Sequence, residues 1–313
     1  MVSQASRSIP LCWRLLLGLC AGLWALLPRP ASADASVSSL GAPQIRADVQ
    51  YAAGSPLSAD PQRSLDLYVP GRAPIAASGP GGSADSAPPL FVYIHGGAWV
   101  SGDKRQYADL GEALARRGVV VAVINYRLSG EGGVRHPAHA QDAAVAVSWL
   151  RKHAGELGFD RSRMFVGGHS AGAHIAALLA YDPSLLAAVG ERPDMIRGYV
   201  GLEGIYDLNE LVRRFPSYRV DFLQVAFGGD EAAWRLASPQ HMNIGHRRPW
   251  LLVHSQHDEL VDVEQSRRFK GALDGKNVPV QWLLLSRGSH FGVIRELTRT
   301  DSPLAQRLLD FMR

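Results

Sequence analysis

From Leu90 to the C-terminus, short apolar runs alternate with longer amphipathic segments, and this alternation leaves few possible folds. Short aliphatic runs suit buried strands, whereas the segments between them have the length and spacing of helices. The pattern predicts an α/β protein with a mostly parallel sheet and helices on both faces. Predicted strands cover residues 90–94, 119–124, 164–166, 198–202, 250–253 and 280–285, and predicted helices cover 106–117, 141–154, 171–181, 264–273 and 304–312.

Two extended runs precede this region, at residues 48–51 and 64–69, and the second alternates apolar with polar side chains, which favours an antiparallel edge pair. Segment 71–89 is rich in Gly, Pro, Ala and Ser without periodicity, so we interpret it as a flexible loop. Segment 208–248 carries several aromatic residues between two predicted strands. We expect it to form a small cap, whose aromatics fit a cap core as well as substrate contacts.

Residues 1–33 have the features of a secretory signal peptide. Arginines precede the apolar run 15–27, which is shorter than the roughly 20 residues needed to span a bilayer. Helix-breaking prolines and the small-x-small triplet 31–33 follow, so Asp34 is the expected new N-terminus. We therefore expect an exported protein, periplasmic or secreted, without stable membrane association after cleavage. An uncleaved N-terminal anchor is the alternative.

Removing this segment changes the composition of the chain. The full sequence has 33 Lys+Arg against 29 Asp+Glu, and the segment contains three arginines and no acid, which leaves 30 against 29. It also contains both cysteines, Cys12 and Cys20; a lipoprotein anchor at Cys20 fits poorly because the bulky Leu19 precedes it. The remaining chain has no thiol for a nucleophile or a metal site, and its near-neutral charge gives no reason to expect nucleic acid as a partner.

A glycine-flanked serine stands between a predicted strand and a predicted helix, in the sequence Gly168-His169-Ser170-Ala171-Gly172. Glycines two residues either side of the serine permit a strained strand-to-helix turn that lifts the hydroxyl above the end of the sheet. In this position the pattern predicts that Ser170 is a catalytic nucleophile. Tight packing of a glycine-rich turn is the structural alternative.

A serine nucleophile needs a base, and the base needs an acid to orient it. Asp258 and His290 follow the last two predicted strands, so the chain order is Ser170, Asp258, His290, as in α/β-hydrolases. Glu259 and Asp262 compete with Asp258 for the role of the acid.

His254 and His257, in the same loop as Asp258, could suggest a metal. Without a third ligand at a recognisable spacing, however, we expect neither a metal nor a cofactor.

The sequence His95-Gly96-Gly97-Ala98-Trp99 follows the strand predicted at residues 90–94. Backbone N–H groups in such a turn can stabilise the oxyanion of an acyl-transfer reaction, because they are fixed before the charge develops. We therefore assign the oxyanion hole to the amides of Gly97, Ala98 and Ala171, and we expect Trp99 to contact substrate. An ordinary tight loop is the alternative.

From about Leu65 to the C-terminus the chain resembles serine hydrolases of the α/β-hydrolase fold, in the branch of hormone-sensitive-lipase-like carboxylesterases and kynurenine formamidases. The resemblance lies in HGGAW followed by Gly102-Asp103-Lys104, in GHSAGAHIAALL and in shorter segments such as Gln256-His257-Asp258. These motifs are also similar to those of isoprenylcysteine methylesterases. The resemblance implies a catalytic domain at residues 65–313, preceded by a lead-in and edge strand at 34–64.

The sequence departs from these relatives at Glu203, where they usually carry a small residue such as Ser. A carboxylate there could bind a polar substrate, assist His290 or form a salt bridge with an arginine, and the salt bridge is the structural interpretation. The export signal is a second departure, because kynurenine formamidase acts inside cells.

We therefore expect an exported enzyme that cleaves short-chain or aryl carboxylic esters through an acyl-serine intermediate. An arylformamidase acting on N-formyl arylamides is the alternative, and a non-catalytic binding protein is a third hypothesis. In each case the expected partner is a small molecule, and the sequence leaves the oligomeric state open.

Overall fold

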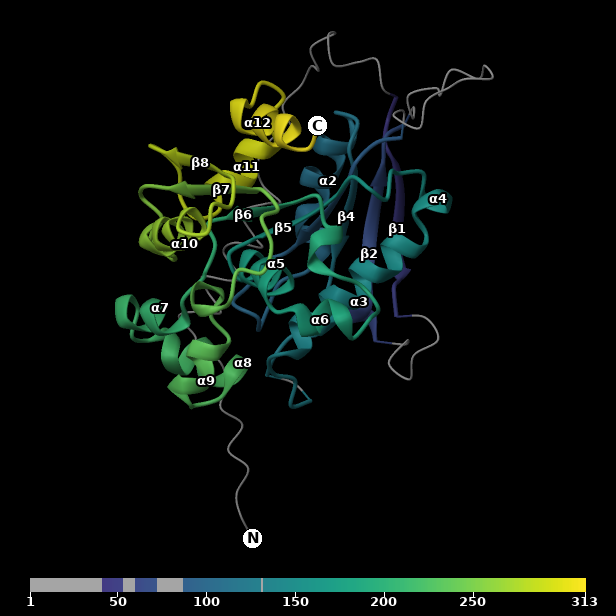
Figure 1. Ribbon diagram of the computed structural model, residues 1–313. Helices are drawn as coiled ribbons and strands as arrows, with labels where there is room; N and C mark the ends of the chain where they lie inside the picture. The colour runs from purple at the N-terminus through teal and green to yellow at the C-terminus, as the bar shows by residue number, and fades with distance from the viewer. Residues whose placement is uncertain (1–40, 53–59, 72–86, 131) are drawn as a thin grey trace. The chain divides into compact units, whose positions relative to one another are not determined.

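The computed structural model describes residues 41–52, 60–71, 87–130 and 132–313, which form one eight-stranded sheet with helices on both faces (Figure 1). The strand order is β1-β2-β4-β3-β5-β6-β7-β8. Strands β1 and β2 are antiparallel to their neighbours, and the pairs from β4 to β8 are parallel. This is the architecture predicted from the alternation. The proposed signal peptide, both cysteines and most of the proposed loop at 71–89 lie outside the described residues.

Every strand predicted from the sequence is present. The bounds are β1 (Gln44–Gln50), β2 (Ser64–Val69), β3 (Leu90–Ile94), β4 (Val120–Ile124), β5 (Met164–His169), β6 (Gly198–Leu202), β7 (Trp250–Ser255) and β8 (Val280–Leu285). Strand β5 continues three residues beyond its predicted end at Val166, because Gly167 and Gly168 pair with β6. Strand β1 begins four residues before its predicted start and contains a register shift between Arg46 and Val49.

Helices α2, α11 and α12 cover one face of the sheet, and α3, α5 and α10 cover the other (Figure 1). The bounds are α2 (Ala108–Ala115), α3 (Ala138–Lys152), α4 (Ala154–Leu157), α5 (Ala171–Tyr181), α6 (Pro183–Ala187), α10 (Glu264–Asp274), α11 (Gly292–Thr298) and α12 (Pro303–Phe311). Every residue of α5 is buried, because this helix lies between the sheet and helices α3 and α6. The helix therefore holds its N-terminus, and the serine before it, in a fixed place.

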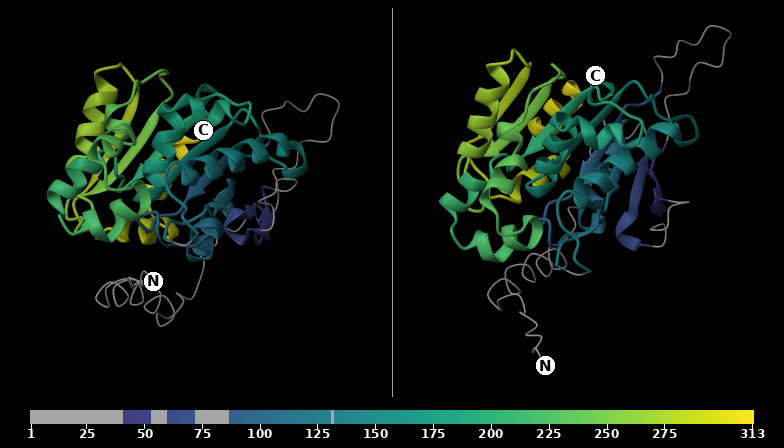
Figure 2. Two further views of the ribbon diagram at one scale, coloured as in Figure 1. Left: turned by 90° about the horizontal axis from the view of Figure 1, so that it is seen from below. Right: turned by 60° about the horizontal axis from the view of Figure 1, so that its bottom comes forward.

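The segment expected to form a cap is helical and lies between β6 and β7. It contains α7 (Leu208–Arg214), the π-helical turn η5 (Arg219–Leu223), α8 (Gln224–Phe227) and α9 (Glu231–Leu236). Figure 2 shows these helices, in green, grouped together at one end of the sheet. Its aromatic side chains are buried or half-buried: Trp234 is fully buried, and the half-buried Phe227 packs its ring edge-on to those of His174 on α5 and Trp99. Among the described residues, no helix is long and apolar enough to cross a membrane.

Candidate active site

Ser170 occupies a sharp turn between β5, which ends at His169, and α5, which begins at Ala171. Its backbone has φ 56° and ψ −120°, a conformation that costs a non-glycine residue on the order of 1–3 kcal/mol. The turn is held by a hydrogen bond from the Ser170 N–H to the Leu202 carbonyl (2.9 Å) and by the Ala173 N–H, which donates to the Ser170 carbonyl (3.0 Å). This is the strained strand-to-helix geometry that the motif predicts.

The glycines of the motif are required by a close approach of backbones. A Cβ atom on Gly172 would lie 2.0 Å from the carbonyl oxygen of Ile94, and one on Gly168 would lie 2.5 Å from the same oxygen. No side chain fits at such distances. The first turn of α5 can therefore lie against the end of β3 only with glycine at both positions.

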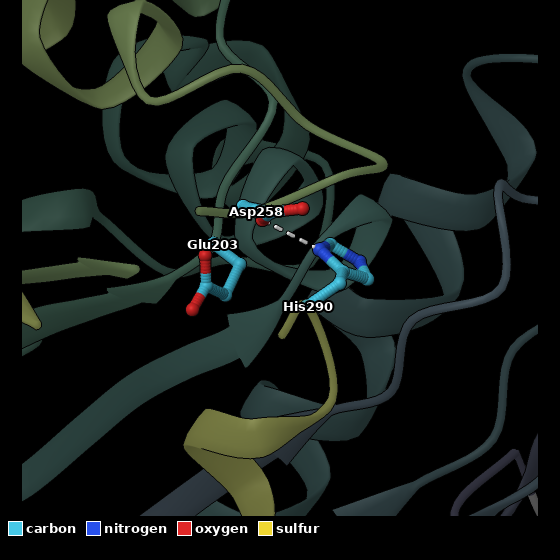
Figure 3. A group of neighbouring side chains, drawn as sticks. All are labelled: Glu203, Asp258 and His290. Carbon is cyan, nitrogen blue, oxygen red and sulfur yellow. Dashed lines mark hydrogen bonds and ion pairs between the residues drawn. The ribbon is translucent and has the colours of Figure 1, made fainter. Parts of the chain in front are cut away.

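Asp258 and His290 meet beyond the ends of β7 and β8. Nδ1 of His290 lies 2.7 Å from Oδ2 of Asp258, and both side chains are buried (Figure 3). The other oxygen, Oδ1, accepts hydrogen bonds from the N–H groups of Leu260 (2.9 Å) and Val261 (3.0 Å). Because a carboxylate only accepts, Nδ1 carries the proton and Nε2 of His290 is left as a base.

The electrostatics of Asp258 favour its charged form. Burial opposes ionisation, but hydrogen bonds from His254 and His290 outweigh it and hold the pKa of this carboxyl well below its usual range. The two competing acids have other partners: Asp262 pairs with Arg214 (2.7 Å), and Oε2 of Glu259 accepts from the backbone N–H of His290 (3.4 Å).

His169 ties the loop of His290 to the turn of Ser170. Its Nε2 lies 2.8 Å from the backbone carbonyl of His290, and the centroids of the two rings are 4.4 Å apart. Burial keeps the pKa of His169 well below its ordinary value, so the neutral ring donates through Nε2. In the described part of the chain, no hydrogen bond joins the Ser170 hydroxyl to His290. Such contacts in hydrolases often tighten only when substrate binds.

The turn after β3 presents the amides assigned to the oxyanion hole. Gly97, Ala98 and Trp99 all have positive φ, at 121°, 50° and 63°. A Cβ atom on Gly97 would lie 2.0 Å from the Ser101 carbonyl oxygen, so only glycine fits there. Within the described residues, the N–H groups of Gly97 and Ala98 donate to no backbone carbonyl, and Ala171 opens α5, where an N–H has no partner within the helix. These donors are therefore available to a ligand.

Trp99, expected to contact substrate, has its ring packed inside the protein. Only 1% of the residue is exposed, its Nε1 donates to Nδ1 of His174 (3.2 Å), and its ring lies edge-on to those of His174 and Phe227. Nε2 of His174 in turn lies 2.9 Å from the Ala237 carbonyl. These contacts anchor the oxyanion turn to α5 and to the segment between β6 and β7.

Glu203 follows β6 and is fully buried beside Asp258 (Figure 3). Its Oε1 accepts from the Ser255 hydroxyl (2.7 Å) and its Oε2 lies 3.3 Å from Nε2 of His254. Among the described ion pairs it has no arginine, so the expected salt bridge is not its environment. Burial first, and then the neighbouring Asp258, raise the pKa of Glu203 to about 9. The carboxyl is therefore protonated at neutral pH.

The two histidines near Asp258 do not form a metal site with it. Nδ1 of His254 lies 2.7 Å from the Ser266 hydroxyl and Nε2 lies 2.9 Å from the Val261 carbonyl, and His257 is exposed. One donor atom from each of Glu203, Asp258 and His290 falls within 4.8 Å of the others. In this group, however, a hydrogen bond joins Asp258 to His290, and Glu203 is protonated, so the donor set fits proton handling better than metal binding.

Sequence reasoning missed the supporting roles of His169, His174 and Ser255. The first two lie in or just after the serine motif, and this position was the available signal. The sequence contains no local signal for the role of Ser255, because its contact with Glu203 joins residues 52 positions apart.

Comparisons with known proteins show what this chain is similar to. The BD-FAE family model matches residues 80–273. The chain is 28% identical over 292 residues to a probable isoprenylcysteine alpha-carbonyl methylesterase, ICMEL2, of Arabidopsis thaliana, covering 88% of this chain and 64% of that protein. It is 31% identical over 251 residues to the kynurenine formamidase avaC of Aspergillus versicolor, covering 68% and 86%. The chain spans 56–64% of the length of the three plant methylesterases ICMEL2, ICMEL1 and ICME.

Solved structures give the fold. An inhibited esterase B from Lactobacillus rhamnosis superimposes with a TM-score of 0.77 at 22% identity, covering 97% of this chain and 94% of that one. Together with the sheet topology, this likeness shows the α/β-hydrolase fold predicted from the sequence.

The protonated state of Glu203 predicts how stability varies with pH. An unfolded glutamate loses its proton near pH 4.5, whereas the folded one keeps it to about pH 9. The contribution of Glu203 to the free energy of unfolding is therefore complete below pH 4.5. It falls as the pH rises towards 9, by up to about 1.4 kcal/mol per pH unit. The side chain of Glu203→Gln does not titrate. The free energy of unfolding of this variant, measured in urea from pH 6 to 9, should therefore rise steadily relative to that of the wild type. A constant difference would contradict the assignment.

Proposed function

Because this chain belongs to the BD-FAE family, we propose that it is a serine hydrolase that cleaves carboxylic esters through an acyl-enzyme on Ser170. The observation that carries the proposal is the placement, at the same edge of the sheet, of a strained serine, a paired histidine and aspartate, and amides that donate to no backbone carbonyl of the described chain. The relatives of this chain include proteins named as esterases and methylesterases, which supports ester hydrolysis in general.

In the proposed first step, Nε2 of His290 removes the hydroxyl proton of Ser170 while Oγ attacks the ester carbonyl carbon. Asp258 accepts a hydrogen bond from Nδ1, which keeps Nε2 free and stabilises the imidazolium that forms. The carbonyl oxygen becomes an oxyanion, which the N–H groups of Gly97, Ala98 and Ala171 bind. One such donor contributes on the order of 3 kcal/mol to the transition state.

The tetrahedral intermediate then collapses to the acyl-enzyme. The bond from the carbonyl carbon to the alcohol oxygen breaks, and the imidazolium of His290 returns its proton to that oxygen. Water repeats the sequence: His290 deprotonates it, it attacks the acyl carbon, and Oγ of Ser170 leaves with the proton. The products are an alcohol and a carboxylic acid, and the chain is restored without a cofactor.

Replacing Ser170 by Ala should abolish turnover of a chromogenic acetate ester and labelling by a fluorophosphonate probe, because the acyl acceptor is gone. The thermal midpoint should stay near wild type, since only the hydroxyl is removed. Ser148→Ala is the matched control, because Ser148 is a buried serine on α3 that bonds Val189 and Glu191, away from the site. Undiminished turnover in Ser170→Ala, or a wild-type protein that takes no label, would favour a non-catalytic binding protein.

The second candidate is hydrolysis of an N-formyl arylamide by the same residues, favoured by the similarity to kynurenine formamidases. The amide nitrogen is a poorer leaving group than an alcohol, so the same site acts more readily on esters unless its pocket binds the formamide specifically. We expect kcat/KM on acetyl and butyryl esters to exceed that on N-formylkynurenine by roughly tenfold or more, a barrier difference of about 1.4 kcal/mol. A preference for the formamide would reverse the ranking.

Export is also proposed, on the pattern of residues 1–33. In its native host the mature protein should have the intact mass of residues 34–313, because a signal peptidase recognises the small residues before Asp34. An intact mass that includes residues 1–33 would instead support an uncleaved N-terminal anchor.

A further inference from the structure

Glu203 has an unusual position for a carboxyl group. Its backbone φ is +50°, it is fully buried, and it comes directly after Leu202, whose carbonyl holds the N–H of Ser170. The Glu203 N–H donates to the Val253 carbonyl (2.9 Å), which links the ends of β6 and β7. A strained backbone that is retained at the centre of a site points to a function for its side chain.

The contacts of the side chain show which form of it is stable there. The Ser255 hydroxyl (2.7 Å) and backbone N–H (3.1 Å) both donate to it, and its neighbours include the carboxylate of Asp258. The ion pairs of the described chain give it no lysine or arginine, and its one basic neighbour there is Nε2 of His254 at 3.3 Å, which lies equally close to Asp258. A second negative charge beside Asp258 would therefore be buried with little compensation. The neutral acid avoids this cost and has a proton to donate.

We propose that Glu203 is a positioning residue: as a neutral carboxylic acid it donates a hydrogen bond to Asp258 and holds that carboxylate in line with Nδ1 of His290. The inference rests on the proposed function, because it assigns a role within the same site. Oδ1 of Asp258 is fixed by two backbone N–H groups, and Oδ2 faces Nδ1 of His290 at 2.7 Å. Nε2 of His254 also lies 3.3 Å from Oδ2, and Glu203 completes this set of donors around the anion.

A neutral donor suits the chemistry better than a second anion. A hydrogen bond to Asp258 lowers the basicity of its carboxylate, so the proton of the imidazolium stays on His290 and remains available to the leaving alcohol. The single charge of Asp258 still stabilises the imidazolium. An ionised Glu203 would repel Asp258 and disturb the alignment.

Several other groups near Glu203 can titrate or carry charge, and the test must separate them from it. His254 approaches from β7, Asp258 and Glu259 from the loop after β7, His290 from the loop after β8, and His169 from the end of β5. The Tyr206 ring lies beyond β6, and burial raises its pKa far above the range tested.

The experiment compares Glu203→Met, which removes the donor at similar size, with Glu203→Gln, whose amide N–H restores it. Glu203→Met should lower kcat by about tenfold to a hundredfold with KM nearly constant, the loss expected for one hydrogen bond to a charged group. It should also move the acid limb of the kcat/KM profile to higher pH, because Asp258 then stabilises protonated His290 more strongly. Glu203→Gln should restore kcat to within about threefold of wild type.

A wild-type decline in kcat above about pH 9, where Glu203 ionises, should be absent from Glu203→Gln. This measurement compares the wild type with Glu203→Gln alone, so it does not depend on whether Glu203→Met folds. Glu191→Met is the control for losing a buried glutamate: Glu191 pairs with Arg151 (3.1 Å) away from the site, so this variant should lower the thermal midpoint and leave both limbs in place.

The outcomes separate this inference from the proposed function. The role of Glu203 alone would be overturned if the wild type is active and labelled at Ser170 while Glu203→Met keeps the wild-type kcat and pH profile. A Glu203→Gln profile that keeps the alkaline decline would do the same. A wild-type protein that takes no fluorophosphonate label would instead overturn the proposed function.

Discussion

The contact between the first turn of α5 and the end of β3 is the constraint on which the site depends. Three glycines allow it: Gly172 and Gly168 lie against the carbonyl of Ile94, and Gly96 lies against His169 and Ser170, where a Cβ atom would come within 3.0–3.2 Å. This approach brings together the helix N-terminus and the turn after β3, the two sources of the proposed oxyanion donors. A larger residue at Gly168 or Gly172 would separate the nucleophile from the amides that it needs.

Most of this arrangement could be predicted because its signals are local. The glycine spacing around Ser170 and the order of Asp258 and His290 after successive strands are visible in the sequence, and parallel strands bring their carboxyl ends to one edge of the sheet. The missed elements depend on neighbours distant in sequence. Strand β5 is lengthened by pairing with β6, and α11 is a seven-residue helix that begins two residues after His290 and buries three apolar residues where it packs against α2 and α12.

The environment of Glu203 shows why charge states were beyond sequence reasoning. A glutamate after a strand suggests an arginine partner, but its actual neighbours are Ser255, His254 and Asp258, which come from the next strand and the loop after it. Within the described chain, the ion-pair partners of Glu203 and Asp258 are all histidines. With Glu203 protonated and His169 neutral, the carboxylate of Asp258 is the anion that is hydrogen-bonded to the His290 ring. One negative charge matches the one imidazolium that the proposed reaction forms.

Backbone strain at this edge of the sheet follows from the direction of the strands. A side chain in a regular strand points to one face of the sheet, whereas the chemistry requires groups that reach across the strand ends towards one another. Positive φ provides this change of direction at Ala98 and Trp99 after β3, at Ser170 after β5 and at Glu203 after β6. Each turn costs on the order of 1–3 kcal/mol. The surrounding core tolerates that cost because α5 and the central strands are almost completely buried, so packing remote from the site keeps these four residues in conformations that they would not adopt alone.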